Sequence, residues 1–438
     1  MEQIPEQMFI SLHLKDHPVL KESKLYKIKY LQMLQNFVGQ YAENNSYAEA
    51  MLNAYYNKFL GISLPLPGVE ISEPTKSDLY SFFLTALQYQ FVFITDCLLI
   101  CAYKNMATAQ KIMAEFKPLF KFDDVALDSL FNALYNRRIV GENIKSATVA
   151  VDCWQKNLRF MRQPGLRILV TANMSAGKST LINAIVGKRL NRTAQEACTA
   201  HLCCLYNKPF EDDLTHLVSP KLVYNASEQD ILDSQKDCDC TLTTYYRTCE
   251  PLPKQVCIID TPGVNSAMNK EHGNLTKQAL QNEKYDKLVY IFNAEQLGTD
   301  EEIAYLRYIV DTVPQNKLIF VINKLDTFNC NEDSIKASIE DVGKDLTKVG
   351  CKKPIICPVS AQFAFLLKLK RSGCALNQKE KLIFDYFSEI FMMDDYDLSI
   401  YYKKQQRTKN RCLPIKDYFT EMSNKCGLYG FEQALFGV

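Results

Sequence analysis

One stretch of the chain restricts the fold more than any other: RILVTANMSAGKSTLINAIVG, residues 167–187. Apolar residues run to Ala172, a short turn follows, and the letters GKST at 177–180 open a segment with helical spacing. A loop of the form G-x-x-x-x-G-K-[ST] directs backbone N–H groups and a helix N-terminus at phosphate oxygens. The stretch therefore predicts a strand, a phosphate-binding loop and a helix.

The loop departs from the usual pattern at its first position, where Ala172 replaces glycine. An alanine at positive φ would cost on the order of 1 kcal/mol, so we expect the loop to begin in an ordinary conformation. Lys178 is expected to reach the β and γ phosphates, and the Ser179 hydroxyl to bind Mg²⁺, which prefers oxygen ligands. The nucleotide-binding residues predicted in this segment are Asn173, Met174, Ser175, Ala176, Gly177, Lys178, Ser179 and Thr180.

A second motif, CIIDTPG at 257–263, supplies groups for the metal and the γ-phosphate. Asp260 ends an apolar strand, where its carboxylate can hold Mg²⁺ through water, and the Gly263 N–H can approach the γ-phosphate closely. Between the two motifs a threonine is expected to close over the Mg²⁺. Thr199 is preferred because it directly precedes the strand-like segment 201–207, and Thr193 is the alternative.

A third motif, FVINKLD at 320–326, is typical of a site that reads a guanine base. The Asp326 carboxylate can accept hydrogen bonds from the N1–H and the exocyclic amine of guanine, whereas adenine has no such pair of donors. A site built around such bonds discriminates by roughly 10⁴ or more. The residues predicted to form the base pocket are Asn323, Lys324 and Asp326, with backbone donors near Ser360 and Ala361 in PVSA.

The chain changes texture near Pro164. Before it, helical spacing predicts an N-terminal all-α bundle over 1–161, with helices at 25–42, 46–60, 82–103, 107–120, 123–138 and about 142–161. After it, short apolar strands alternate with helices, which predicts an α/β domain with a mostly parallel sheet over 162–438. The predicted strands lie within 166–172, 201–207, 253–261, 287–294, 317–324 and 354–361.

Composition excludes some partners. The 51 Lys and Arg residues nearly balance the 50 Asp and Glu residues, so no overall field favours nucleic acid, and we expect no nucleic-acid partner. The 16 cysteines lack zinc-type spacing, and the chain opens without a signal-like segment, which together indicate a reducing cytoplasm. The apolar run 82–103 contains Gln88, Gln90 and Asp96, which are costly in lipid, so we expect a helix buried in the bundle.

Five segments together resemble the GTPase domain of bacterial dynamin-like proteins. They are MSAGKSTLINAIVG, the Thr199 region, IDTPGVN, FNAEQLGTDEE and INKLD. The resemblance covers roughly 162–438. It implies an α/β P-loop G domain, hydrolysis of GTP to GDP with Mg²⁺, and a homodimer formed across the nucleotide face. It also places a neck-like helix at about 142–161, before the G domain.

The resemblance also assigns roles to single residues. Ser175 matches the phosphate-loop serine that helps to place a monovalent cation, Na⁺ or K⁺, in dynamins. Ser175, Lys178 and Thr199 are the catalytic residues that it implies, and Ser179, Thr199 and Asp260 are the metal ligands. Met174 stands where dynamins usually carry glutamine, so water would be held mainly by Thr199 and backbone groups, and we expect slow turnover in the monomer.

Residues 379–397, followed by the basic run 401–411, admit two interpretations. In the first, they lie on an anionic membrane surface as a peripheral contact. In the second, they belong to a helical and basic insertion at about 362–415. In the second case Phe384, Phe387 and Phe391 pack on the α/β domain, and the acidic residues of the same helix favour this interpretation.

Three functions can be weighed against the sequence. One is GTP hydrolysis coupled to assembly or membrane remodelling. Another is a soluble GTP-dependent switch whose helical bundle binds a protein partner; a scaffold with a degenerate pocket is a third, which the intact Lys178 and Asp326 oppose. Dynamin-like proteins continue into a helical stalk where this sequence ends, so we expect it to be part of a longer protein; the alternative is a protein without self-assembly machinery.

Overall fold

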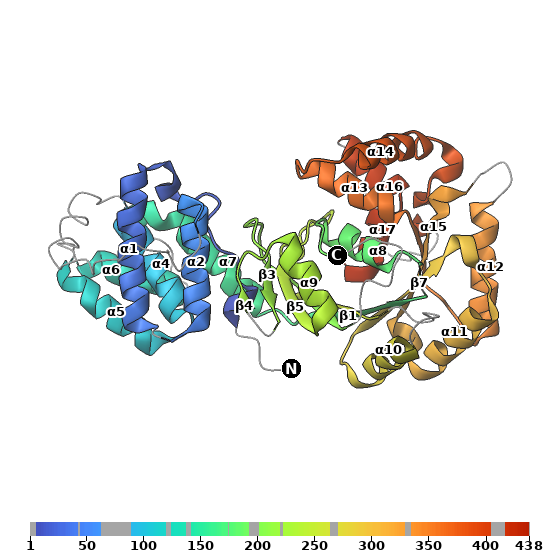
Figure 1. Cartoon of the computed structure of the whole chain (residues 1–438), viewed down its shortest axis with the longest axis horizontal. Coiled ribbons are helices and arrows are strands. Elements are labelled where there is room, and N and C mark those ends of the chain that lie inside the picture. Colours follow the sequence, from blue (N-terminus) through green and yellow to red (C-terminus); the bar gives the residue numbers. More distant parts are fainter. Residues whose placement is uncertain are drawn as a thin grey trace. The chain divides into compact units, whose positions relative to one another are not determined.

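The computed structural model describes residues 6–42, 44–62, 89–119, 124–136, 142–173, 175–191, 201–219, 222–262, 270–328, 334–403 and 417–437 (Figure 1). The chain divides into two compact units. The first comprises Met1–Gln163, Lys208–Ala226 and Thr243–Tyr245, and the second comprises Pro164–Asn207, Ser227–Leu242 and Tyr246–Val438.

The first unit is a helical bundle. Its described α-helices are α1 (Lys24–Tyr41), α2 (Ser46–Leu60), α4 (Gln90–Ala102), α5 (Met106–Leu119), α6 (Asp124–Tyr135) and α7 (Thr148–Met161). The short 3-10 helices η1 (Glu6–Phe9), η2 (Pro18–Lys21) and η4 (Glu142–Ala147) complete it. Local signals set the ends: the Ser23 hydroxyl accepts from the Tyr26 N–H before α1, and Gly61 adopts φ 70° after α2.

Helix α4 lies at the centre of this bundle, because each of its residues except Cys101 is buried. A helix that is apolar on all sides is buried in a core or spans a membrane, and here the neighbours are α1, α2 and α5. The predicted buried helix is thus confirmed over 90–102, whereas 82–88 lie outside the described residues. Among the described residues no helix is long and apolar enough to cross a membrane.

The first unit also contains a segment from far along the chain, Lys208–Ala226, with strands β3 (His216–Val218) and β4 (Leu222–Val223) paired antiparallel. Hydrogen bonds attach it to the N-terminal segment: the Ser11 hydroxyl donates to the Phe210 carbonyl at 2.6 Å. The Leu12 N–H donates to Asp212 at 2.9 Å. These contacts join residues about 200 positions apart, which no local pattern predicts.

The second unit is built on a mostly parallel sheet. Its strands follow the order β5-β2-β6-β1-β7-β8-β9, with β1 parallel to β6 and β7, and β7, β8 and β9 successively parallel; β2 pairs antiparallel with β6. The strands are β1 (Leu166–Ala172), β2 (Cys203–Asn207), β5 (Cys240–Thr244), β6 (Val256–Asp260), β7 (Lys287–Asn293), β8 (Leu318–Asn323) and β9 (Ile356–Val359).

Helices cover both faces of this sheet. Figure 1 shows α10 (Lys270–Asn282) and α11 (Asp300–Thr312) on one side, and α8 (Lys178–Val186), α13 (Ala361–Arg371) and α17 (Leu428–Phe436) on the other. The remaining α-helices described are α9 (Glu228–Asp237), α12 (Ile335–Lys348), α14 (Gln378–Ile390), α15 (Ser399–Lys403) and α16 (Tyr418–Lys425). Short 3-10 helices lie at η5 (Ala294–Gln296), η6 (Gln315–Lys317), η7 (Leu325–Thr327) and η8 (Asp394–Tyr396).

The predicted fold class, a helical bundle followed by a mostly parallel sheet flanked by helices, is confirmed. All six predicted strands are present, but β3, β4 and β5 were not predicted from the sequence. Strand β5 has the sequence CTLTT. Its threonines are polar, so the segment lacks the apolar run from which the other strands were predicted, although all of its residues are buried. The predicted helix at 142–161 begins as the 3-10 helix η4 and becomes α-helical only at Thr148.

The insertion packs on the sheet unit as one of the two interpretations requires. Phe384, Phe387 and Phe391 are all buried, and the Phe391 ring stacks on Phe363 of α13 at 5.2 Å between centroids. The packing interpretation is therefore confirmed for this face of α14. Residues 404–416, which hold most of the basic run, lie outside the described residues.

Candidate nucleotide-binding site

The phosphate loop joins the carboxyl end of β1 to α8. Gly177 occupies the N-cap position at φ 86°, and no side chain caps the helix there. Because the first N–H groups of a helix have no intrahelical partner, they can donate to a bound anion. Ala172 ends β1 and has no positive φ, as expected, whereas Ser175 takes φ 62°. The loop therefore bends at Ser175 and Gly177 rather than at its first residue.

Gly177 is required for a second reason. A Cβ atom at this position would collide with the amide nitrogen of Asn323, which donates to the Ala176 carbonyl at 2.9 Å. The amide oxygen of Asn323 accepts from the Ala361 N–H at 3.0 Å. One buried side chain thus connects the phosphate loop to the start of α13.

At the end of β6, Asp260 is fully buried and pairs with Lys178. Its second oxygen accepts from the Asn191 amide at 2.7 Å. Burial raises the pKa of Asp260, while Lys178 and the hydrogen bond from Asn191 act in the opposite direction. The two groups predicted to serve phosphate and metal therefore hold one another in this state.

Asn191 is a site residue that the sequence analysis did not find. Asn183 of α8 positions it: the Asn183 amide oxygen accepts from the N–H groups of Leu190 and Asn191, and its amide nitrogen donates to the Asn191 carbonyl at 2.8 Å. Gln235 of α9 donates to the Asn191 side chain at 3.0 Å. No motif carries this information, because the contacts depend on where α9 packs.

The base-reading residues follow β8 and β9. Asp326 is 4% exposed and accepts a hydrogen bond from the Ser360 hydroxyl. Burial raises the pKa of Asp326 to about 6, and the bond from Ser360 opposes that rise. Lys324 adopts φ 68° and its ammonium pairs with Glu295 at 2.8 Å. These side chains stand at the same sheet edge as Asp260, because parallel strands bring their carboxyl ends together.

Several predicted residues meet at this edge and others cannot be placed. Asn173, Ser175 and Ala176 lie in the phosphate loop, and Ser179 and Thr180 lie in the first turn of α8. Met174, Thr199, its alternative Thr193, and Gly263 fall outside the described residues.

Glu302 of α11 was not predicted from the sequence. Its side chain is buried, and its carboxylate accepts from the Asn173 amide at 3.5 Å and from the Gly298 N–H at 3.0 Å. Burial raises the pKa of Glu302.

The described ligands suit Mg²⁺. A serine hydroxyl at Ser179 and a carboxylate at Asp260 are hard oxygen donors, the kind that this ion prefers. Bound there with a nucleotide, Mg²⁺ would neutralise charge on the phosphates. Since Lys178 now occupies one Asp260 oxygen, its ammonium is the group that has to turn toward the phosphates.

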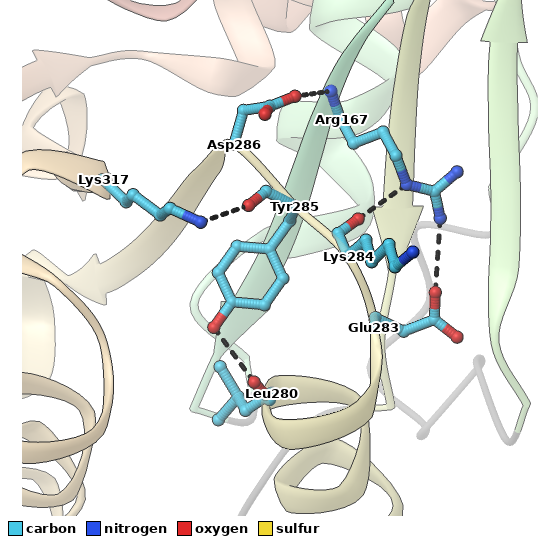
Figure 2. Close-up of a pocket in the computed structure, with 7 residues that line it drawn as sticks. All are labelled: Arg167, Leu280, Glu283, Lys284, Tyr285, Asp286 and Lys317. Carbon is cyan, nitrogen blue, oxygen red and sulfur yellow. Dashed lines mark hydrogen bonds and ion pairs between the residues drawn. The ribbon is translucent and has the colours of Figure 1, made fainter.

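A separate pocket of about 350 Å³ lies at the opposite edge of the sheet, at the amino ends of β1, β7 and β8 (Figure 2). Arg167 donates there to the Lys284 carbonyl at 2.6 Å and to Glu283 at 3.2 Å. Lys317 donates to the Tyr285 carbonyl at 2.7 Å. Arg167 is thus paired with Glu283, Lys317 is bound to a backbone carbonyl, and none of the predicted nucleotide-binding residues lines this pocket.

Comparisons with known proteins identify a family whose model matches part of this chain. Residues 168–325 match the model of the dynamin family. A probable transmembrane GTPase, FZO-like and chloroplastic, from Arabidopsis thaliana is 27% identical over 214 residues, which are 48% of this chain and 20% of that protein. Dynamin-like protein A of Bacillus subtilis (strain 168) is 26% identical over 126 residues, 28% of this chain and 10% of that protein.

The chain thus spans no more than a fifth of the length of these two relatives. Among solved structures, a chain described as part of an oligomerised bacterial dynamin pair that senses and tethers membranes aligns with a TM-score of 0.37 and 15% identity. That alignment covers 88% of this chain and 60% of the other.

Proposed function

Since this chain carries a dynamin-type GTPase domain, we propose that it binds GTP and hydrolyses it with Mg²⁺, and that the nucleotide state controls pairing of two chains through this domain. The observation that supports the proposal is the meeting of three separate motifs at one sheet edge. Asn323 bonds both the phosphate loop and the start of α13, so one ligand can touch phosphate-binding and base-reading groups together.

The described residues take the following roles. Lys178 and the N–H groups at the start of α8 bind the phosphates, and Ser179 and Asp260 hold the metal. Asp326 accepts from guanine, and Asn323 keeps the two loops in register. Ser175, with a Na⁺ or K⁺ ion, positions the charge, and Thr199, which lies outside the described residues, is proposed to position the attacking water.

Among the described residues, the buried carboxylates at this edge are already engaged: Asp260 with Lys178, Asp326 with Ser360, and Glu302 with the Asn173 amide and the Gly298 N–H. Catalysis then depends on positioning and on electrostatic stabilisation of the transition state. We propose that a second chain, docked across the nucleotide face, positions Thr199 and Gly263 against the phosphates. Turnover is slow in the monomer and faster in the pair.

The test is a GTPase assay over a wide range of protein concentration, in Na⁺ and in K⁺, with Lys178→Ala as the inactive control. We expect the rate per molecule to rise with concentration and to depend on the monovalent cation. A rate per molecule that stays constant while light scattering shows pairing would refute the coupling. No Lys178-dependent hydrolysis at any concentration would refute the enzyme assignment.

We further propose that the chain works in the cytoplasm at a membrane surface. The Arabidopsis relative is named a transmembrane GTPase, which supports the membrane part of this proposal only. The exposed apolar side chains of α14 and the turn after it, Leu382, Tyr386, Met392 and Met393, are where such contact is to be tested. Co-sedimentation with anionic liposomes, with and without a non-hydrolysable GTP analogue, should show nucleotide-dependent pelleting that Leu382→Ser with Tyr386→Ser reduces. Absence of pelleting favours the soluble switch, in which the bundle binds a protein partner.

A further inference from the structure

A buried polar cluster in the helical unit has no part in the nucleotide chemistry. His13 and His17 lie in the segment before α1, and Asp96 lies in α4. The Nε2 atom of His13 is 2.9 Å from one carboxylate oxygen of Asp96, and the Nε2 atom of His17 is 3.0 Å from the other. The side chains are 3% exposed for His13 and 0% for the other two, so three groups of metal-ligating type converge in a site without solvent.

The cluster has an outer layer that orients the carboxylate. The Tyr55 hydroxyl of α2 donates to Asp96 Oδ1 at 2.9 Å, and the Tyr30 hydroxyl of α1 donates to Oδ2 at 2.5 Å. The two imidazole rings stack at 5.2 Å with an interplanar angle of 21°, so both Nε2 atoms face the same carboxylate. Hydrogen bonds to a ligating carboxylate are the usual second layer of a metal site.

Two features of the cluster remain uncompensated. The Nε2 atom of His13 is buried and makes no hydrogen bond with any described residue, although it is close to Asp96. Within the described ranges no Lys or Arg pairs with Asp96, so a buried carboxylate has only histidines and tyrosines around it. When both histidines are neutral, this buried carboxylate has no countercharge, which is costly, and a cation placed among the three groups would remove both deficits.

We propose that His13, His17 and Asp96 form a binding site for a first-row divalent transition metal, with Zn²⁺ as the best fit. The ligating atoms all lie within 4.8 Å of one another, which one ion can span. Two imidazole nitrogens and one carboxylate favour Zn²⁺ or its neighbours over Mg²⁺ and Ca²⁺, which prefer all-oxygen sites. The metal would fasten the N-terminal segment to α4 and so couple metal binding to folding of the bundle.

One contact fixes the tautomer of His17. The Nδ1 atom of His17 accepts from the Val19 N–H at 3.3 Å, which places the proton of a neutral His17 on Nε2. Coordination through Nε2 moves this proton to Nδ1, with no net release, and ends the contact with Val19. Metal binding therefore has a signature at His17 that a purely structural hydrogen-bond network lacks.

The experiment uses the full chain, stripped of metal by a chelator, kept reduced and held in excess Mg²⁺ to fill sites for hard cations. Co²⁺ and Zn²⁺ are titrated while the visible d–d bands of Co²⁺, the melting temperature and the ¹⁵N shifts of histidine are recorded. We expect one equivalent of Co²⁺ with d–d bands, no thiolate charge-transfer band, displacement by Zn²⁺ and a raised melting temperature.

Variants separate this site from others. His13→Asn with His17→Asn should abolish the bound equivalent, whereas His201→Asn, which removes a partly exposed histidine of the sheet unit, should retain it. If the double variant does not fold, Tyr55→Phe still tests the outer layer, with affinity falling about 10-fold to 100-fold. Wild-type protein that takes up no such equivalent, or Co²⁺ bands unchanged in the histidine variants, would overturn the proposal and leave a hydrogen-bonded network only.

Discussion

Replacing Asp326 by asparagine should change which base the site accepts. The side chain is 4% exposed, so its hydrogen bonds to a bound base do not compete with bulk water. With a pKa of about 6, the carboxylate is mostly ionised at pH 7.5 and can accept from both guanine donors. Asparagine retains one oxygen but presents an amide N–H group to the guanine amine, where two donors face one another.

The magnitude follows from this exchange. A hydrogen bond to a charged group contributes about 1.5–3 kcal/mol, and a buried donor left without a partner costs about 1–3 kcal/mol. A total near 3 kcal/mol corresponds to GDP binding that is roughly a hundredfold weaker. Xanthine has a carbonyl in place of the guanine amine, so the Asn amide can donate to it, and the variant should bind xanthosine diphosphate more tightly than the native protein does.

The assay is calorimetric titration of both diphosphates into native protein and the variant at pH 7.5. Asp300→Asn is the matched control, because it makes the same chemical change at an exposed position in the first turn of α11. It should leave both affinities unchanged. If Asp326→Asn weakens GDP less than threefold and gains nothing for the xanthine nucleotide, Asp326 does not read the base and the reasoning fails.

Three further outcomes follow from the same edge of the sheet. Gly177→Ala places a Cβ against the Asn323 amide at φ 86°, and titration should show GDP binding at least about tenfold weaker, whereas Gly39→Ala, with open space around it, should bind normally. Lys178→Ala leaves buried Asp260 without its cation, so urea unfolding of nucleotide-free protein should show a loss of about 3 kcal/mol that Asp260→Asn partly restores. The raised pKa of Asp326 leaves its carboxyl group protonated below about pH 6 in the free protein, whereas guanine needs the ionised form. GDP affinity should therefore fall about tenfold from pH 7 to pH 5. A pH profile that is unchanged by Asp326→Asn would contradict this.

The sequence alone was sufficient wherever the signal is local. Six strands, the phosphate loop and the motifs after β6 and β8 could be predicted because apolar runs of strand length end in residues with a specific chemical use. The placement of Asp260 and Asp326 at one edge also followed, since parallel strands share the direction of their ends.

Contacts between distant residues needed the tertiary structure. Asn191 donates to Asp260 and is itself held by Asn183 and Gln235. Strand β5 lies next to β2 in the sheet, and its threonines are buried. The segment 208–226 joins the helical unit through Ser11 and Leu12, although it is flanked in sequence by strands of the sheet.

The cluster at His13, His17 and Asp96 shows the difference most clearly. Within the sequence, the two histidines are ordinary residues of an N-terminal segment, and Asp96 reads as a polar interruption of an apolar helix. Periodicity and motif spacing report which groups a short stretch of chain presents. Packing between segments about 80 residues apart decides which of these groups come into contact and are removed from water. That burial changes their charge balance.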